Sequence, residues 1–299
     1  MTTTTATSPI PGAEARTLEV PGATLTYDVR RNETTTEPPI FLIGAPAGAA
    51  GFPTLAGHLA DRTVITYDPR GTERSSAHDP EEPITPRTAL EDLHAIVAEI
   101  GGPVDVFASS GGAVNGLAWV ATYPSDVRTL VAHEPPLASQ VSDREHALTA
   151  TQALYETYMR SGFGPAMAHF IAVVSHQGAF TAEIAASPPP DPAMFGMPTE
   201  DDGNRTDLMF AHQMRWLVTY EPDYDALRRS SSRIVLAAGA ESGGNLASRG
   251  AFAVAERLGT DVVLFPGDHG AFMGGEYGQP PSEHHEAFGV KLREVLASA

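Results

Sequence analysis

The feature that most constrains the fold of this chain is a serine between a strand-like run and a helix-like run. A short β-branched and aromatic run ends in Ala108-Ser109-Ser110-Gly111-Gly112, and an apolar segment of helical length follows at 113–123. Small residues are needed around so tight a turn, because the backbones of the strand and the helix nearly touch. The pattern predicts that the turn exposes the hydroxyl of Ser110 as a nucleophile.

Short apolar runs alternate with helical periodicity along most of the chain. Runs typical of strands lie at 17–20, 23–29, 39–43, 63–68, 104–107, 129–132, 233–238 and 261–265. Segments typical of helices lie at 54–60, 88–100, 113–123, 251–258 and 282–296. This alternation predicts an α/β fold with a mostly parallel central sheet and flanking helices. The first two strands flank the turn signal Pro21-Gly22, and we expect them to pair antiparallel.

Residues 139–226 interrupt the alternation. They carry helical stretches at 144–159, 165–175 and 205–219, with a Pro-rich segment at 187–190. Ligands of open α/β sheets bind at the carboxyl ends of the strands, where such an insertion emerges, so we expect a helical lid (cap) over the serine. The expected organisation is a disordered leader at 1–15, a core at 16–138 and 227–299, and the lid at 139–226.

A serine nucleophile needs a base, an acid that orients the base, and donors for the developing oxyanion. For a serine on this type of turn, the acid and then the histidine follow in chain order. His269 lies between glycines in the loop after the last expected strand, and it is the predicted base. His284 and His285 fall in the last expected helix and are interpreted as surface residues.

Two glutamates are candidates for the acid. Glu134 follows the expected strand at 129–132, and Glu241 follows the one at 233–238, so either can reach the histidine. Asp268 is adjacent to His269 in the sequence and is badly placed to orient its imidazole. The residue pattern alone leaves Glu134 and Glu241 open.

The oxyanion donors are expected to be two backbone N–H groups. One belongs to Gly111, the residue after the nucleophile, and the other comes from the loop Gly44-Ala45-Pro46-Ala47-Gly48. Pro46 has no N–H, so Ala45 is the better candidate. The nearby segment 67–75 is interpreted as a strand end and a turn with a structural role.

Composition excludes several classes of partner. The net charge of −18 argues against binding to nucleic acid or to an anionic membrane surface, and no run approaches the length of a membrane span. The chain has no cysteine and no signal-peptide pattern, so we expect a cytoplasmic protein without thiolate metal ligands. No metal or organic cofactor is implied. The Met and aromatic residues of 139–226 suit a pocket lining or a dimer surface, which leaves a homodimer open.

Together these residues resemble the α/β-hydrolase superfamily over about residues 17–298. Ser110-Gly111-Gly112 precedes an apolar helix that ends at Tyr123-Pro124, and Ile43-Gly44-Ala45-Pro46 stands in place of the family's His-Gly-x-Pro loop. Tyr67-Asp68-Pro69-Arg70-Gly71 is similar to its Asp-x-Arg-Gly turn. Two residues depart from the family's pattern. Ile43 replaces the usual histidine, and Ala108 replaces the first glycine of the Gly-x-Ser-x-Gly turn around the nucleophile, the nucleophile elbow. Neither change removes a catalytic group.

A narrower resemblance is to the zearalenone lactonases. Their elbow is similar to Ser109-Ser110-Gly111, and a Tyr-Pro pair and a His-Glu-x-Pro segment follow, here His133-Glu134-Pro135-Pro136. The glutamate of that segment is the triad acid in the family and stands at the same separation from the serine, so the resemblance implies Glu134 rather than Glu241. It also implies that Trp216 matches a lid tryptophan that contacts the lactone.

The sequence therefore predicts a serine hydrolase that cleaves a carboxylic ester or a lactone through an acyl-enzyme. The predicted triad is Ser110, His269 and Glu134, with Ala45 and Gly111 as oxyanion donors and a small-molecule substrate. The alternatives are a cofactor-free perhydrolase or a C–C hydrolase with the same triad, and a non-catalytic ligand-binding protein of the same fold.

Overall fold

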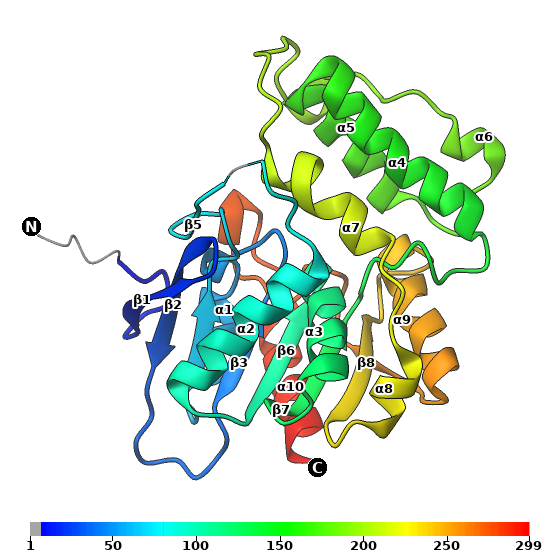
Figure 1. Cartoon of the computed structure of the whole chain (residues 1–299). Helices are drawn as coiled ribbons and strands as arrows, with labels where there is room; N and C mark the ends of the chain where they lie inside the picture. Colours follow the sequence, from blue (N-terminus) through cyan, green and yellow to red (C-terminus); the bar gives the residue numbers. More distant parts are fainter. Residues whose placement is uncertain (1–6, 80, 299) are drawn as a thin grey trace, which may run out of the picture.

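The computed structural model describes residues 7–79 and 81–298, and this part of the chain forms one sheet with helices around it (Figure 1). The sheet has nine strands in the order β1-β2-β4-β3-β6-β7-β8-β9, and β5 pairs with β2. The strands are β1 Glu14–Val20, β2 Ala23–Arg30, β3 Ile40–Ile43, β4 Val64–Tyr67, β5 Ser76–Ala77, β6 Val104–Ser109, β7 Val127–His133, β8 Arg233–Gly239 and β9 Val262–Phe265.

The strands from β4 to β9 in this order pair parallel, whereas β1, β2 and β5 add antiparallel pairs at one side. The expected turn joins β1 to β2, with Val20 opposite Ala23 and Gly22 at φ 78°. Positive φ is accessible to glycine at little cost, which explains the turn signal. The prediction of an α/β fold with a mostly parallel sheet is confirmed.

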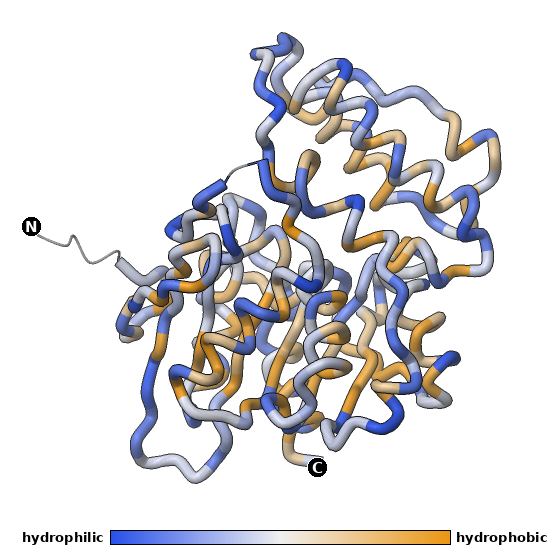
Figure 2. The backbone as a smooth tube through the Cα atoms, viewed as in Figure 1, coloured by the Kyte–Doolittle hydropathy of each residue, from blue (hydrophilic) through white to orange (hydrophobic). Residues whose placement is uncertain are grey.

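Side chains alternate between the two faces of the sheet. On β3, Phe41 and Ile43 join one buried cluster with α2, α3, α8 and α9, whereas Ile40 and Leu42 join a second cluster with α1 and α10. Both faces are covered, so the central strands are hydrophobic along their length (Figure 2). These helices are α1 Pro53–Gly57, α2 Pro86–Ile100, α3 Gly111–Thr122, α8 Tyr224–Arg229, α9 Leu246–Leu258 and α10 His285–Ala297, with short turns η1 Ala49–Gly51 and η4 Glu276–Gly278.

The segment between β7 and α8 forms a separate helical layer at one end of the sheet, which we call the cap (Figure 1). It has its own buried cluster, which includes Leu154, Tyr158 and Phe210. Its elements are α4 Arg144–Ser161, α5 Phe163–Ser175, α6 Ala182–Ala185, η2 Pro192–Phe195, the π-helix η3 Leu208–Gln213 and α7 Met214–Val218. Within the described residues, no helix combines the length and the apolar character that a membrane span requires.

Three expectations differ from the structure. The leader was expected to be disordered over 1–15, but Ile10 is buried in the cluster that contains α10, and β1 begins at Glu14. This part of the expectation is wrong because the buried side chain of Ile10 and the pairing of β1 with β2 order this segment; residues 1–6 lie outside the described residues.

The expected boundary between the lid and the core, at 226/227, falls inside α8. This helix packs Tyr224 and Leu227 into the core, so the core begins before residue 227.

The helix expected over 205–219 is shorter and is divided. The carboxylate of Asp207 accepts a hydrogen bond from the N–H of Phe210 at 3.0 Å, which caps a π-helix over Leu208–Gln213, and α7 follows it directly. An N-cap of this kind satisfies a donor that the first turn cannot satisfy itself. The helical segment therefore begins after Asp207.

Candidate active site

The turn between β6 and α3 holds Ser110 in an uncommon backbone conformation. Ser110 has φ 58° and ψ −127°, a region that non-glycine residues rarely occupy. Its N–H donates to the carbonyl of His133 on β7 at 2.9 Å, and its own carbonyl accepts from Ala113 at 2.9 Å. These two bonds hold the strained residue between the sheet and the first turn of α3, as is common at functional sites.

Two glycines allow this turn to approach the loop after β3. A Cβ on Gly112 would lie 2.6 Å from the carbonyl oxygen of Ile43, and one on Gly111 would lie 2.6 Å from that of Ala45. Close approach of the two backbones therefore requires glycine at both positions. It also brings the N–H groups of Ala45 and Gly111 to the same region, and neither donates a hydrogen bond within residues 7–79 and 81–298.

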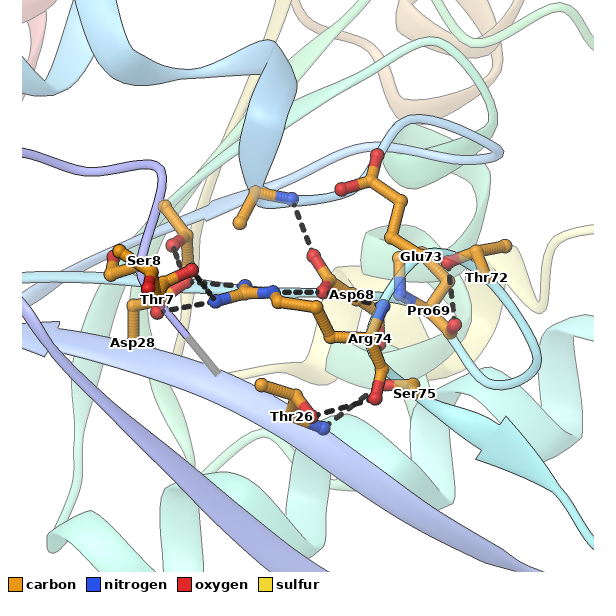
Figure 3. A network of polar contacts seen from close by, with 12 residues as sticks. Thr7, Ser8, Thr26, Asp28, Asp68, Pro69, Thr72, Glu73, Arg74 and Ser75 are labelled. Carbon is orange, nitrogen blue, oxygen red and sulfur yellow. Dashed lines mark hydrogen bonds and ion pairs between the residues drawn. The ribbon is translucent and has the colours of Figure 1, made fainter. Parts of the chain in front are cut away.

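A buried charge network anchors the loop that carries Ala45 (Figure 3). One carboxylate oxygen of Asp68 accepts from the N–H of Ala49 at 3.0 Å, and the other accepts from Nε of Arg74 at 2.6 Å. The same guanidinium donates two further bonds to Asp28, at 2.9 and 2.7 Å. Charge-assisted bonds of this kind are strong and directional, so the network fixes the loop from behind.

His269 lies in the loop after β9 and bonds to Glu134 at the end of β7. The distance between Nδ1 of His269 and Oε2 of Glu134 is 2.6 Å. The other oxygen of Glu134 accepts from the N–H of Gly239 at 2.8 Å, and its own N–H donates to Ala237. The backbone at the ends of β7 and β8 therefore orients the carboxylate of Glu134 toward the imidazole of His269.

Glu134 is fully buried, yet its surroundings favour the ionised form. Burial alone would raise its pKa, but the hydrogen bond and the charge of His269 outweigh burial and lower the pKa to about 2. An ionised carboxylate on Nδ1 keeps the proton at that nitrogen and leaves Nε2 free to act as a base.

The other two acidic candidates lie elsewhere. The side chain of Glu241 is 61% exposed and pairs with Nε2 of His284 at 3.2 Å. Asp268 accepts a bond from the N–H of Gly270 in its own loop at 3.0 Å. Of the three carboxylates considered from the sequence, Glu134 is the one in contact with His269.

A second histidine, His133, supports the site from inside the core. Its ring is fully buried, neither nitrogen has a hydrogen-bond partner within the described residues, and its centroid lies 6.0 Å from that of His269. Burial lowers its pKa to about 3, so the ring is neutral near pH 7. It is surrounded by aromatic rings, those of Phe107, Phe265, Phe272 and Phe288.

Ser110, Gly111, Ala45 and His269 all line one cavity of about 240 Å³ between the core and the cap. No Asp, Glu, Lys or Arg of the described chain lines it. A ligand in this cavity is therefore expected to be neutral and largely apolar where it meets the wall. The remaining wall is formed by Pro46, Pro136, Thr151, Leu154, Phe170, Val173, Val174, Met209, Gln213, Met214, Leu217, Val218, Asn245, Leu246 and Ala247.

Trp216 does not line this cavity, in contrast to the expectation for a lid tryptophan. Trp216 is 38% exposed, and the guanidinium of Arg215 lies 5.4 Å from its ring. On α7, Met214 and Leu217 face the cavity, and Trp216 occupies another side of the helix. The expectation is corrected because the orientation of this short helix, not the residue type, selects the lining residues.

Sequence reasoning missed the cap residues that do line the cavity, among them Leu154, Gln213 and Leu217. Positions 213, 214, 217 and 218 follow the spacing of one helix face, which predicts a shared direction. That spacing does not indicate whether the face meets the cap interior or the cavity. Among the described residues, no group of three or more His, Asp or Glu side chains has the arrangement of a metal site.

Comparisons with known proteins agree with the observed α/β fold. Residues 38–221 match the family described as alpha/beta hydrolase fold. A curated relative, the uncharacterized hydrolase YraK of Bacillus subtilis (strain 168), is 29% identical over 288 residues, which cover 94% of this chain and 95% of the relative.

Solved structures of similar fold include hydrolases of several kinds. The enol-lactonase of Burkholderia xenovorans LB400 superposes with a TM-score of 0.63 at 17% identity, covering 94% of this chain and all of the other. An esterase of Exiguobacterium antarcticum has a TM-score of 0.62 at 16% identity, covering 93% and 97%. The proline iminopeptidase of Mycobacterium smegmatis has a TM-score of 0.60 at 20% identity, covering 95% and 98%.

Proposed function

The chain belongs to the α/β-hydrolase fold family, and from this premise we propose that it hydrolyses a carboxylic ester or a lactone through an acyl-enzyme on Ser110. The observation that carries the proposal is the set of chemical groups that meet at one cavity. A serine on a strained turn, two backbone N–H groups without a partner among the described residues, and an imidazole bonded to a buried carboxylate all line or adjoin it. This is the combination that acyl transfer requires.

In the first half of the reaction, Oγ of Ser110 attacks the carbonyl carbon and Nε2 of His269 takes the hydroxyl proton. The carbonyl electron pair moves to oxygen, where the N–H groups of Gly111 and Ala45 stabilise the charge; removal of one such donor would raise the barrier by about 3 kcal/mol. The electron pair then returns, the bond to the leaving oxygen breaks, and His269 protonates that oxygen.

In the second half, a water molecule attacks the acyl-enzyme while His269 accepts one of its protons. Collapse of the second tetrahedral intermediate releases the acid, and the proton returns to Oγ of Ser110. The ionised Glu134 stabilises the imidazolium in both halves. For a lactone, the leaving hydroxyl stays attached to the acyl group, so the cavity must hold both ends of the opened ring.

The character of the cavity supports an ester or a lactone over an aminopeptidase substrate. A free α-ammonium group in an apolar cavity would need a carboxylate partner. No Asp or Glu of the described residues lines this cavity. A neutral ester has no such requirement and can bury its apolar groups against the aliphatic side chains of the cap.

The test uses the two adjacent serines at the end of β6. Ser110→Ala is expected to lower the turnover of p-nitrophenyl butyrate by at least about 10⁴-fold and to abolish labelling by a fluorophosphonate probe, because the nucleophile is lost. Ser109→Ala is the matched control and should keep the labelling. Labelling that persists in Ser110→Ala, or that disappears in Ser109→Ala alone, would contradict the assignment.

A further inference from the structure

One polar side chain of the cap enters the apolar cavity without a hydrogen-bond partner. Gln213 ends the π-helix, lines the cavity and is 3% exposed. Its Oε1 is buried and accepts no hydrogen bond within the described residues. An unpaired buried acceptor is costly, so such a group is expected to pair with something that binds there.

A small side chamber lies next to the main cavity on the side of the oxyanion loop. Its free volume is about 10 Å³, close to the space that one water molecule or one hydroxyl group needs. Ala45, Gln213 and Leu217 line both hollows, so the chamber adjoins the cavity where the ester carbonyl is expected. Gln213 therefore stands at the boundary between an apolar space and a polar one.

A second unpaired carboxamide lines the side chamber from the core. Asn115 lies one helical turn after Gly111 on α3, is 4% exposed, and its Oδ1 has no hydrogen-bond partner within the described residues. Residues four apart on a helix share a face, so Asn115 lies on the side of α3 that carries the oxyanion donor. Two unpaired carboxamide oxygens, one from the cap and one from the core, thus border the same chamber.

The charged groups of the chamber are already paired with each other. The guanidinium of Arg70 donates to both oxygens of Asp92, at 3.1 and 2.6 Å, and both residues are buried. Burial raises the pKa of Tyr67 far above its usual value, so its phenol is neutral. The chamber therefore offers neutral hydrogen-bonding groups and a compensated ion pair, which suits an uncharged polar ligand.

We propose that Gln213 and Asn115 form a subsite for one hydroxyl group of the substrate, so that the preferred substrate is an apolar ester or lactone with a single hydroxyl substituent. The inference rests on the proposed function and specifies its substrate class. A hydroxyl both donates and accepts, so it pairs with a carboxamide in either orientation, whereas a carboxylate would meet two carbonyl oxygens. The size of the chamber admits the hydroxyl and leaves the rest of the substrate in the apolar cavity.

The test compares esters that differ by one hydroxyl. The panel is methyl phenylacetate and methyl 3-phenylpropanoate, each beside its meta- and para-hydroxy analogues, and methyl hexanoate beside its terminal hydroxy analogue, all assayed by proton release. The wild-type enzyme is expected to hydrolyse at least one hydroxylated ester with a kcat/KM about tenfold above that of its parent. In Gln213→Met this ratio should fall to about three or below, because the pairing group is replaced by a thioether of similar length.

Thr151→Val is the matched control. Thr151 lines the same cavity, but its hydroxyl already donates to the carbonyls of Ala147 and Leu148, so its removal should leave the ratio unchanged. Fluorophosphonate labelling reports whether each variant keeps a formed site. If Gln213→Met is not labelled, Asn115→Ala takes its place.

The outcomes separate the subsite from the proposed function. Hydrolysis of the parent esters with no preference for any hydroxylated analogue would overturn the subsite and leave the ester hydrolase standing. A preference that survives in Gln213→Met would overturn the role of Gln213. If the wild-type enzyme hydrolyses p-nitrophenyl butyrate but no ester of the panel, the substrate class fails and the ester hydrolase stands; if it hydrolyses neither, both fail.

Discussion

The two walls of the cavity differ in how their polar groups are held. On the core wall, the carboxylate of Glu134 has partners at both oxygens, and Ser110 is fixed by backbone bonds to β7 and α3. On the cap wall, aliphatic side chains predominate, and the carboxamide oxygen of Gln213 has no partner within the described residues. The side chains of the candidate triad on the core side are thus already positioned, whereas the cap wall carries a carboxamide whose hydrogen bonds a ligand can complete.

The difference follows from the supports behind each wall. Ser110 and Glu134 lie at the ends of β6 and β7, and each of these strands is paired in parallel with a neighbour on both sides. Gln213 ends a π-helix of six residues, and Met214 and Leu217 stand on the five-residue α7 that follows it. A π-helix is rare and is often found at functional sites. We therefore expect changes in the core wall to alter rates and changes in the cap to alter selectivity.

The largest expected effect separates the two glutamates. Glu134→Gln should lower kcat by about 10³–10⁴-fold, because the amide cannot stabilise the imidazolium and favours the wrong tautomer. Glu241→Gln is the matched control on the solvent side and should change kcat by less than about threefold, since Glu241 pairs with His284. Steady-state kinetics on one ester decide between them. A greater loss of kcat in Glu241→Gln would contradict this assignment and would place the acid after β8 instead of β7.

A smaller effect concerns the buried imidazole behind His269. The pKa of His133 is about 3 in the folded state, well below its ordinary value of 6.5, so between these pH values the unfolded chain binds a proton that the folded chain does not. This contribution to stability is complete above pH 6.5 and is lost as the pH falls toward 3, at about 1.4 kcal/mol per pH unit.

His133→Leu removes this titration while it keeps an apolar side chain of similar volume. Urea unfolding at pH 7.5 and at pH 5.5 should show a weaker pH dependence in the variant than in the wild-type protein. The comparison uses the change between the two pH values, so a uniform loss of stability through imperfect packing does not affect it. An identical pH dependence in both proteins would mean that His133 binds protons equally in the folded and unfolded chain, so that folding does not lower its pKa.

The smallest expected effect lies on the outer side of the cap. Trp216→Ala should change kcat/KM by less than about threefold for any ester of the panel, because Trp216 stacks on Arg215 and does not line the cavity. Progress curves at low substrate concentration measure it directly. A loss that depends on the ester would show that the cap places this side chain against the substrate during turnover.

Much of the fold could be predicted because the relevant signals are local. Alternating apolar runs located the strands that build the sheet, and the Pro21-Gly22 turn indicated the antiparallel pair of β1 and β2. The expected leader failed at Ile10, because one apolar residue in a polar segment gives no periodic signal. The start of the divided helix after Asp207 also escaped prediction. Its position depends on the hydrogen bond from the N–H of Phe210 to the side chain of Asp207, and the hydrophobic periodicity does not report that bond.

The candidate site divides in the same way. The order of Ser110, Glu134 and His269 along the chain, each at the end of an expected strand, is a property of the sequence. The pattern left Glu134 and Glu241 equal, because both follow parallel strands and no local signal reports which carboxylate is buried. The fold separates them: Glu134 is buried beside His269, whereas Glu241 is largely exposed beside His284.

By itself, the sequence determined the elbow. Small residues around Ser110, with glycines at 111 and 112, mark a tight turn from a strand into a helix, which is a local pattern; the atoms that a Cβ there would meet belong to Ile43 and Ala45 of the loop after β3. Only the tertiary structure decided which cap side chains meet the substrate. Gln213 and Trp216 stand three residues apart on consecutive helical elements, yet one enters the cavity and the other faces solvent. That choice depends on how short helices rotate and pack over a sheet, and packing of this kind is a property of the whole molecule.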